Sequence, residues 1–189
     1  MISRFPAGIG SLLMAVIWIL PVAFAAGAVV VAISRHRNAD RGVIIDRLVM
    51  VGLMAALSAV AVLTLQPLGG TGFDAPRAPT LNPLSRIGRK DALDNLLLFL
   101  PVGFFAALWW RSRPRPVVWA AGLAFTASCT IEMTQLVLPI NRAASIHDVM
   151  FNTLGGFLGG LAALLVMRLV ERSMRSTEAL GPELQTETT

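Results

Sequence analysis

Five long apolar stretches separated by short polar segments dominate the pattern of hydrophobic positions along the chain. They cover residues 9–33, 48–65, 94–110, 117–138 and 148–169. A helix needs roughly 20 mostly apolar residues to cross the hydrocarbon core of a bilayer, and these stretches are close to that length. The pattern therefore predicts an all-α fold, a polytopic bundle of about five membrane-spanning helices.

The composition supports a membrane protein and argues against other classes. Hydrophobic residues make up 55% of the chain and charged residues only 14%, whereas a soluble domain carries about a quarter charged residues. The formal net charge is +5, which in a soluble protein would suggest nucleic acid. Here the arginines lie in short runs between apolar stretches, so we expect membrane lipids and no nucleic acid as partners. Cys129 is the only cysteine, and we expect no cofactor and no metal site.

The chain divides into three parts. Residues 1–80 are predicted to form an N-terminal pair of transmembrane helices with an outer loop, and residues 81–172 a core with three transmembrane helices. Residues 173–189 are polar, and we expect a disordered cytoplasmic tail. Ala23-Phe24-Ala25 resembles a signal-peptide cleavage site, but the apolar run continues to Ile33, which is too long for a signal peptide. An uncleaved first helix is favoured, and cleavage is the alternative.

Arginine and lysine are unevenly divided between the two sides of the predicted bundle. Cytoplasmic segments of membrane proteins carry the excess of these residues. This rule places the N-terminus outside and the C-terminus in the cytoplasm, with the helices crossing the plasma (inner) membrane. The split is ten against six, with Arg35, Arg37, Arg41, Arg47, Arg111, Arg113, Arg115, Arg168, Arg172 and Arg175 inside, and Arg4, Arg77, Arg86, Arg89, Lys90 and Arg142 outside.

Polar residues within the predicted spans gather at the outer side. Ser128, Glu132 and Gln135 form one stripe of a helix, because they are spaced by four and three residues. The next span begins with Asp148 and Asn152, also four apart, and their stripe continues into a face of glycines that would allow close helix approach. The candidate polar site consists of Glu132, Gln135, Arg142, Asp148, Asn152, Asn95 and Asp94.

Each of these residues also has a purely structural interpretation. Asp94 and Asp148 are candidates for helix N-caps, and the asparagines for interhelical hydrogen bonds. His147 is expected to be an exposed loop residue. An ionised carboxylate within a span costs about 2.5–3.5 kcal/mol on insertion scales, so Glu132 needs a partner or a task. Arg142 is its natural partner, either as a structural pair or within a functional site that uses both residues.

Four short motifs give the chain a resemblance to a known family. They are Asn95-Leu96-Leu97-Leu98-Phe99-Leu100-Pro101-Val102-Gly103-Phe104, Glu132-Met133-Thr134-Gln135, Asn141-Arg142 and Asp148-Val149-Met150-Phe151-Asn152-Thr153-Leu154-Gly155. In this order and spacing they resemble the VanZ-like family, named for a protein that confers teicoplanin resistance. The resemblance covers about residues 82–166, so the predicted core at 81–172 is a VanZ-like core. It implies a bacterial envelope protein and supplies no reaction.

Three functions are compatible with these residues. The first is a membrane factor that recognises a lipid or a lipid-linked cell-wall precursor at the outer face and affects glycopeptide (teicoplanin) susceptibility. The alternative is a membrane-embedded enzyme acting on a phosphate or ester of an envelope lipid, although no nucleophile elbow, P-loop or H-E-x-x-H motif is present. A proton-coupled transporter is third, because the inner halves of the last three spans contain no charged residue except Arg168 at the very end of the fifth.

The predicted orientation can be tested with single cysteines. In a Cys129→Ser background, Ser112→Cys lies in an arginine-rich turn that the positive-inside rule places in the cytoplasm. Ser145→Cys precedes the last span on the opposite side. We expect a membrane-impermeant thiol reagent added to intact cells to label the cysteine at 145 and to spare the one at 112. The reverse labelling pattern would place the polar residues on the cytoplasmic side.

Overall fold

The computed structural model describes residues 7–37, 39–65, 89–138 and 144–186, with side chains described for 19–37, 39–65, 91–138 and 144–176. The described residues form five helices, all long and apolar enough to cross a membrane. This confirms the predicted all-α bundle with five spans. The helices are α1 (Ala7–His36), α2 (Arg41–Leu65), α3 (Arg89–Trp109), α4 (Pro116–Val137) and α5 (Ile146–Thr186).

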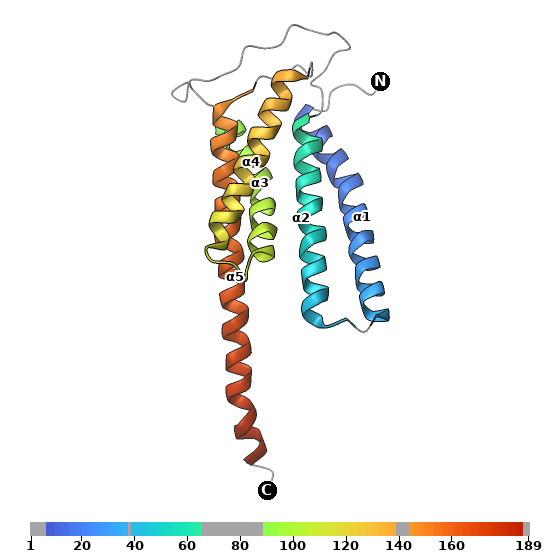
Figure 1. The fold of residues 1–189 in the computed structure, drawn as a ribbon, viewed down its shortest axis with the longest axis vertical. Helices are drawn as coiled ribbons and strands as arrows, with labels where there is room; N and C mark the ends of the chain where they lie inside the picture. Colours follow the sequence, from blue (N-terminus) through green and yellow to red (C-terminus); the bar gives the residue numbers. More distant parts are fainter. Residues whose placement is uncertain (1–6, 38, 66–88, 139–143, 187–189) are drawn as a thin grey trace.

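The helices alternate in direction and form two groups (Figure 1). Helix α5 packs most extensively against α3 and next against α4, so these three form a compact unit. Helix α2 packs on α3 and more sparingly on α4, whereas α1 packs on α2 alone among the described elements. We call the end where α2 and α4 finish and α3 and α5 begin the polar end, and the opposite end the basic end.

Glycines set the distance between α5 and α3. A Cβ added at Gly155 would overlap the backbone carbonyl of Leu96, and one added at Gly159 would overlap the carbonyl of Leu100. The two backbones are therefore in direct contact over successive turns of both helices. In lipid there is no hydrophobic force between helices, so such close van der Waals packing is a main source of association.

Glycines of α5 also allow α4 to pack closely on the other side of α5. Gly156 packs against the Cβ of Ala124, and Gly160 against Val117 at the start of α4. A Cβ at Gly103 of α3 would in turn overlap the carbonyl of Gly156. Pro101 lies inside α3, which continues past it to Trp109. The close approach at Gly103 is thus a packing contact with α5 that the sequence pattern of α3 alone did not reveal.

Polar contacts join the helices at the basic end. Arg47 donates a hydrogen bond from Nη1 to the hydroxyl of the fully buried Ser34, 2.8 Å away, which links α2 to α1. Arg111, in the turn between α3 and α4, forms an ion pair with Asp46 of α2. This turn ends at Arg115, which has the left-handed φ of 54°, and Pro116 then begins α4. The first contact holds α1 to α2, and the ion pair holds α2 to the three-helix unit.

Helix boundaries differ from the predicted ones at two places. Helix α3 begins at Arg89 rather than near Asp94, so the polar residues before the apolar run are already helical. Helix α5 continues to Thr186 through the segment for which we predicted a disordered tail. A helix propagates more easily than it nucleates, and a stable span can extend into good helix formers such as Met174 and Arg175. The outer loop was predicted at residues 67–93; residues 67–88 lie outside the described residues, and residues 89–93 belong to α3.

Substitution of Gly159 tests the glycine packing. In Gly159→Ala the new methyl group meets backbone rather than a mobile side chain, so the helices must separate. Overpacking of this kind costs about 1–3 kcal/mol, and we expect a clear loss of thermal stability of the detergent-purified protein, measured by size-exclusion chromatography after heating.

The matched control is Gly122→Ala in α4, where an added Cβ has nothing within 4 Å. Alanine is favoured over glycine within a helix by roughly 0.5–1 kcal/mol, so this variant should be at least as stable as the parent. Equal stability of the two variants would contradict backbone contact at Gly159.

Candidate functional site

The buried polar side chains of the described core concentrate at the polar end. Glu132 lies five residues before the end of α4 and Asn152 six residues after the start of α5. At about 1.5 Å per residue both lie roughly 8–9 Å from the helix ends. We define the polar cluster as Thr64, Asn95, Ser128, Glu132, Gln135, Ser145, Asp148 and Asn152.

The polar stripe predicted for α4 is present. Ser128, Glu132 and Gln135 are all buried, while Met133, which points about 100° away from Glu132 around the helix, is exposed and available to lipid. The helical period thus separates the polar and apolar faces of α4, and the polar face lies inside the bundle.

Asn152 and Ser128 join α5 to α4. The side-chain amide Nδ2 of Asn152 donates to the Ser128 hydroxyl at 2.8 Å, in fully buried surroundings. The carbonyl oxygen Oδ1 of Asn152 is also buried, and it has no hydrogen-bond partner within the described parts of the chain. A buried acceptor left without a donor costs about 1–3 kcal/mol. A water molecule or a ligand that donates a hydrogen bond to Oδ1 would remove this cost.

Asn95 and Asp148 join α3 to α5. The Asn95 amide donates from Nδ2 to Asp148 Oδ1 at 2.7 Å, and both side chains are half-buried. Capping of α5 is performed by Ser145, whose hydroxyl accepts from the backbone N–H of His147 at 3.3 Å. Asp148 lies in the first turn of α5, but its carboxylate also reaches across to a neighbouring helix.

Glu132 fixes the beginning of α5. Its Oε2 accepts a hydrogen bond from the backbone N–H of Ser145 at 2.6 Å, directly before α5 begins. A hydrogen bond from an N–H group to a carboxylate is stronger than one between two neutral groups. Here such a bond connects the end of α4 to the start of α5. Arg142, its predicted partner, lies outside the described residues, so that pairing stays a prediction.

Gln135 extends the cluster to α2. Its Nε2 donates to the backbone carbonyl of Thr64 at 3.0 Å, and both residues are buried. The hydroxyl of Thr64 in turn donates to the carbonyl of Val60 at 2.7 Å. The sequence analysis missed Thr64, although it is a polar residue in the last turn of a mostly apolar span. Polar contacts at this end thus reach α2, α3, α4 and α5.

Two residues lie elsewhere than predicted. Asp94 is exposed on α3, because it precedes Asn95 by one residue and adjacent helical residues point about 100° apart. The described contacts therefore do not bring it to the cluster. His147 is only 4% exposed, so its interpretation as an exposed loop residue was wrong. Helix α5 begins at Ile146, which places His147 in the first helical turn.

The cluster can accept and donate hydrogen bonds but does not resemble a metal centre. Glu132 and Asp148 supply carboxylates, and Asn95, Gln135 and Asn152 supply amides. No group of three or more metal-ligating side chains gathers among the residues whose positions are described. These side chains are suited to a polar ligand that has hydroxyl or amine groups to donate hydrogen bonds and oxygen atoms to accept them.

Comparison with protein-family models finds one that matches most of the chain. A family model described as VanZ/LLP1 matches residues 12–167. The match spans all five helices up to the membrane-spanning part of α5. No curated protein and no solved structure matches the chain.

A double-mutant cycle tests the Asn152–Ser128 bond. We expect Asn152→Ala and Ser128→Ala to be coupled by about 0.6 kcal/mol, and by no more than about 1.7 kcal/mol, the average and the maximum found for hydrogen bonds between membrane helices. The measurement is the free energy of reversible unfolding in mixed micelles. Thr130→Ala serves as the control partner, because the Thr130 hydroxyl is exposed and bonds within its own helix. Additivity within error for the Asn152 and Ser128 pair would contradict the contact.

Proposed function

The chain belongs to the VanZ/LLP1 family, and from this membership we propose that it is a bacterial envelope protein whose polar cluster binds the head group of a lipid or lipid-linked precursor at the outer leaflet. Its five helices make it a multi-pass membrane protein. Glycopeptides act outside the plasma membrane, so binding at this face would connect the protein to glycopeptide susceptibility.

The observation that carries the proposal is the unpaired Oδ1 of Asn152, in a side chain that is only 2% exposed. An acceptor of this kind is rare in buried positions, and a hydroxyl or amine donor of a head group would satisfy it. The half-buried Asn95 and Asp148 lie nearer the helix ends and would form the approach to it.

The depth of the cluster also suits a head group. The bilayer is about 40–45 Å thick including its polar regions, of which about 30 Å is hydrocarbon. Helix α4 has 22 residues, so it is about 33 Å long and its ends lie near the edges of the hydrocarbon. Side chains roughly 8–9 Å from the helix ends would therefore lie several ångströms inside the hydrocarbon, where a head group drawn inward would lose its water. Glu132, Gln135 and Asn152 would replace water as hydrogen-bonding partners for a head group at this depth.

Arg142 supplies the positive charge of the proposed site. It precedes Ser145 by three residues, and Ser145 is bound to Glu132. Three residues span at most about 10 Å, so covalent connectivity limits how far Arg142 can lie from Glu132. A guanidinium binds phosphate in a bidentate manner, which favours a phosphate-containing head group.

The second candidate is an enzyme acting on the same class of lipid. The buried His147 favours it, because it adds a titratable group to the end that holds Glu132 and Asp148. General acid–base chemistry on a phosphate or ester needs such groups near one another. The described part of the chain offers no activated nucleophile beside them, so binding is the better-supported function.

Lipid retention tests the proposal. We expect full-length protein purified in mild detergent to retain a phosphate-containing lipid, identified by mass spectrometry of the extract, at a near-stoichiometric level. Arg142→Ala and Asn152→Leu should each lower this amount at least fivefold, which corresponds to losing one charged or hydrogen-bonding contact. Asp94→Asn is the matched control, because it removes an exposed carboxylate outside the cluster and should leave retention unchanged.

The outcome separates the two candidates. Turnover of a labelled lipid that disappears in Glu132→Gln would establish the enzyme instead. Retention that is equal in Arg142→Ala, Asn152→Leu and the parent protein, with all three folded, would contradict head-group binding. Expression of the parent and the Arg142→Ala variant in a glycopeptide-susceptible host tests the link to teicoplanin, and equal susceptibility of both would remove it.

A further inference from the structure

A groove of about 660 Å³ opens between α1, α2 and α3, away from the polar cluster. Its volume lies within the roughly 300–1,000 Å³ typical of ligand sites. Small residues form much of its wall, and its lining is apolar except near one end. Residues from all three helices contribute, among them Gly27, Ala28 and Ala32 of α1, Val51 and Gly52 of α2, and Phe105 of α3.

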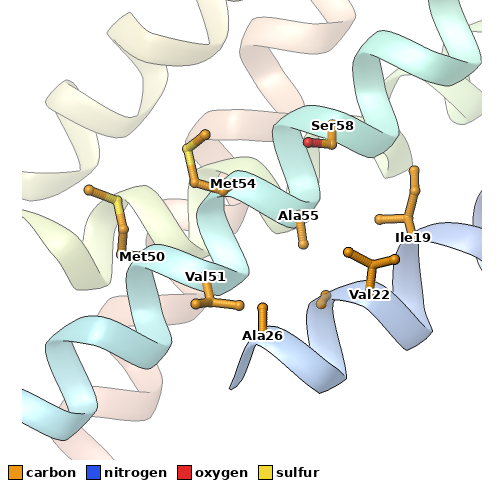
Figure 2. A pocket seen from close by; sticks show the side chains of 9 residues that line it. Ile19, Val22, Ala26, Met50, Val51, Met54, Ala55 and Ser58 are labelled. Carbon is orange, nitrogen blue, oxygen red and sulfur yellow. The ribbon is translucent and has the colours of Figure 1, made fainter. Parts of the chain in front are cut away.

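The groove exists because few other residues pack against α1. Helix α1 packs on α2 alone, and a Cβ added at Gly27 would only touch Leu48 at an ordinary 3.6 Å. Beneath it Gly52 packs tightly on the ring of Phe105, which forms a firm floor. A smaller pocket of about 350 Å³ continues along the seam of α1 and α2 from the shared residues Ala23 and Val51 (Figure 2).

The groove has the length of one bilayer leaflet. It runs along α1 from Ala23, near the middle of the helix, to Arg35, next to its end. This distance is about 18 Å at 1.5 Å per residue. Half of the hydrocarbon core is about 15 Å, so the acyl chain of a lipid in the leaflet at the basic end would extend along the groove.

A positive charge without a partner lies at the end of the groove. Arg35 is exposed and has neither a hydrogen bond nor an ion pair within the described ranges. Its neighbours are engaged, since Arg47 donates to Ser34 and Arg111 pairs with Asp46. The Arg35 guanidinium is thus available at the depth where lipid phosphates lie.

We propose that this groove binds one anionic phospholipid, with an acyl chain lying between α1 and α2 on Phe105 and the phosphate held by Arg35. An apolar channel of leaflet length that ends in an arginine complements this ligand in both shape and charge. The site is independent of the polar cluster, which lies at the opposite end of the bundle.

A second copy of the chain is the competing occupant, because small residues also admit helices. The charge distribution favours the lipid. In a symmetric membrane dimer the basic ends of both copies lie at the same face. The two Arg35 side chains would then approach one another across the contact, and like charges repel. An anionic lipid instead neutralises Arg35.

The test compares two arginines. Full-length protein in zwitterionic phosphatidylcholine nanodiscs is titrated with phosphatidylglycerol, and bound lipid is counted by native mass spectrometry. We expect Arg35→Gln to weaken phosphatidylglycerol binding at least fivefold, the effect of losing one direct, charge-assisted contact to the phosphate. Arg37→Gln is the control, because Arg37 is exposed at the same end but does not line the groove. It should change binding less than twofold.

A second variant tests the apolar part. Ala28→Leu places a larger side chain in the groove, and it should lower the binding of phosphatidylglycerol while the melting temperature stays near that of the parent. Three outcomes would overturn the proposal. They are parent-like binding by Arg35→Gln, equal loss in Arg37→Gln, and efficient disulfide cross-linking between copies through Ala28→Cys in bilayers that contain phosphatidylglycerol.

Discussion

Backbone contact between α5 and α3 is the constraint on which the rest of the structure depends. Gly155 and Gly159 bring the α5 backbone against the carbonyls of Leu96 and Leu100, and Gly156 packs on α4 at the same level. This contact fixes the axial register of α5. A shift by one helical turn, about 5.4 Å, would separate Asn95 from Asp148 and Asn152 from Ser128. The polar cluster is therefore a consequence of glycine packing as much as of its own hydrogen bonds.

The cluster in turn connects α4 to α2, a pair that packs only sparingly, and to the beginning of α5. Gln135 binds the last turn of α2, and Glu132 holds the backbone at the beginning of α5. Each contact joins a side chain of α4 to the end of another element, where unpaired backbone groups are available. In the hydrocarbon core of a membrane there is no water to bond these backbone groups, so they need partners within the protein. The proposed head-group site is thus built from residues that also close the polar end of the bundle.

Much of this arrangement could be predicted from sequence, and the exceptions have physical causes. Hydropathy gave the five spans, and helical spacing gave the buried stripe of Ser128, Glu132 and Gln135. Asp94 was predicted in the site together with Asn95, although adjacent residues of a helix point about 100° apart and only one of the two can face the cluster. His147 was expected to be a loop residue because the last helix was predicted to begin at Asp148, whereas it begins at Ile146. Thr64 was missed because its contribution is mainly a backbone carbonyl, which no side-chain pattern reports.

The length of α5 has a mechanical consequence. Its 41 residues extend over roughly 60 Å, about twice the thickness of the hydrocarbon core. Because its first half is clamped between α3 and α4, the part beyond the bilayer behaves as a lever. A tilt of the clamped half by about 10° would displace the far end by roughly 5 Å, so a rearrangement among the buried side chains at one membrane face would be amplified into movement in the aqueous compartment on the other.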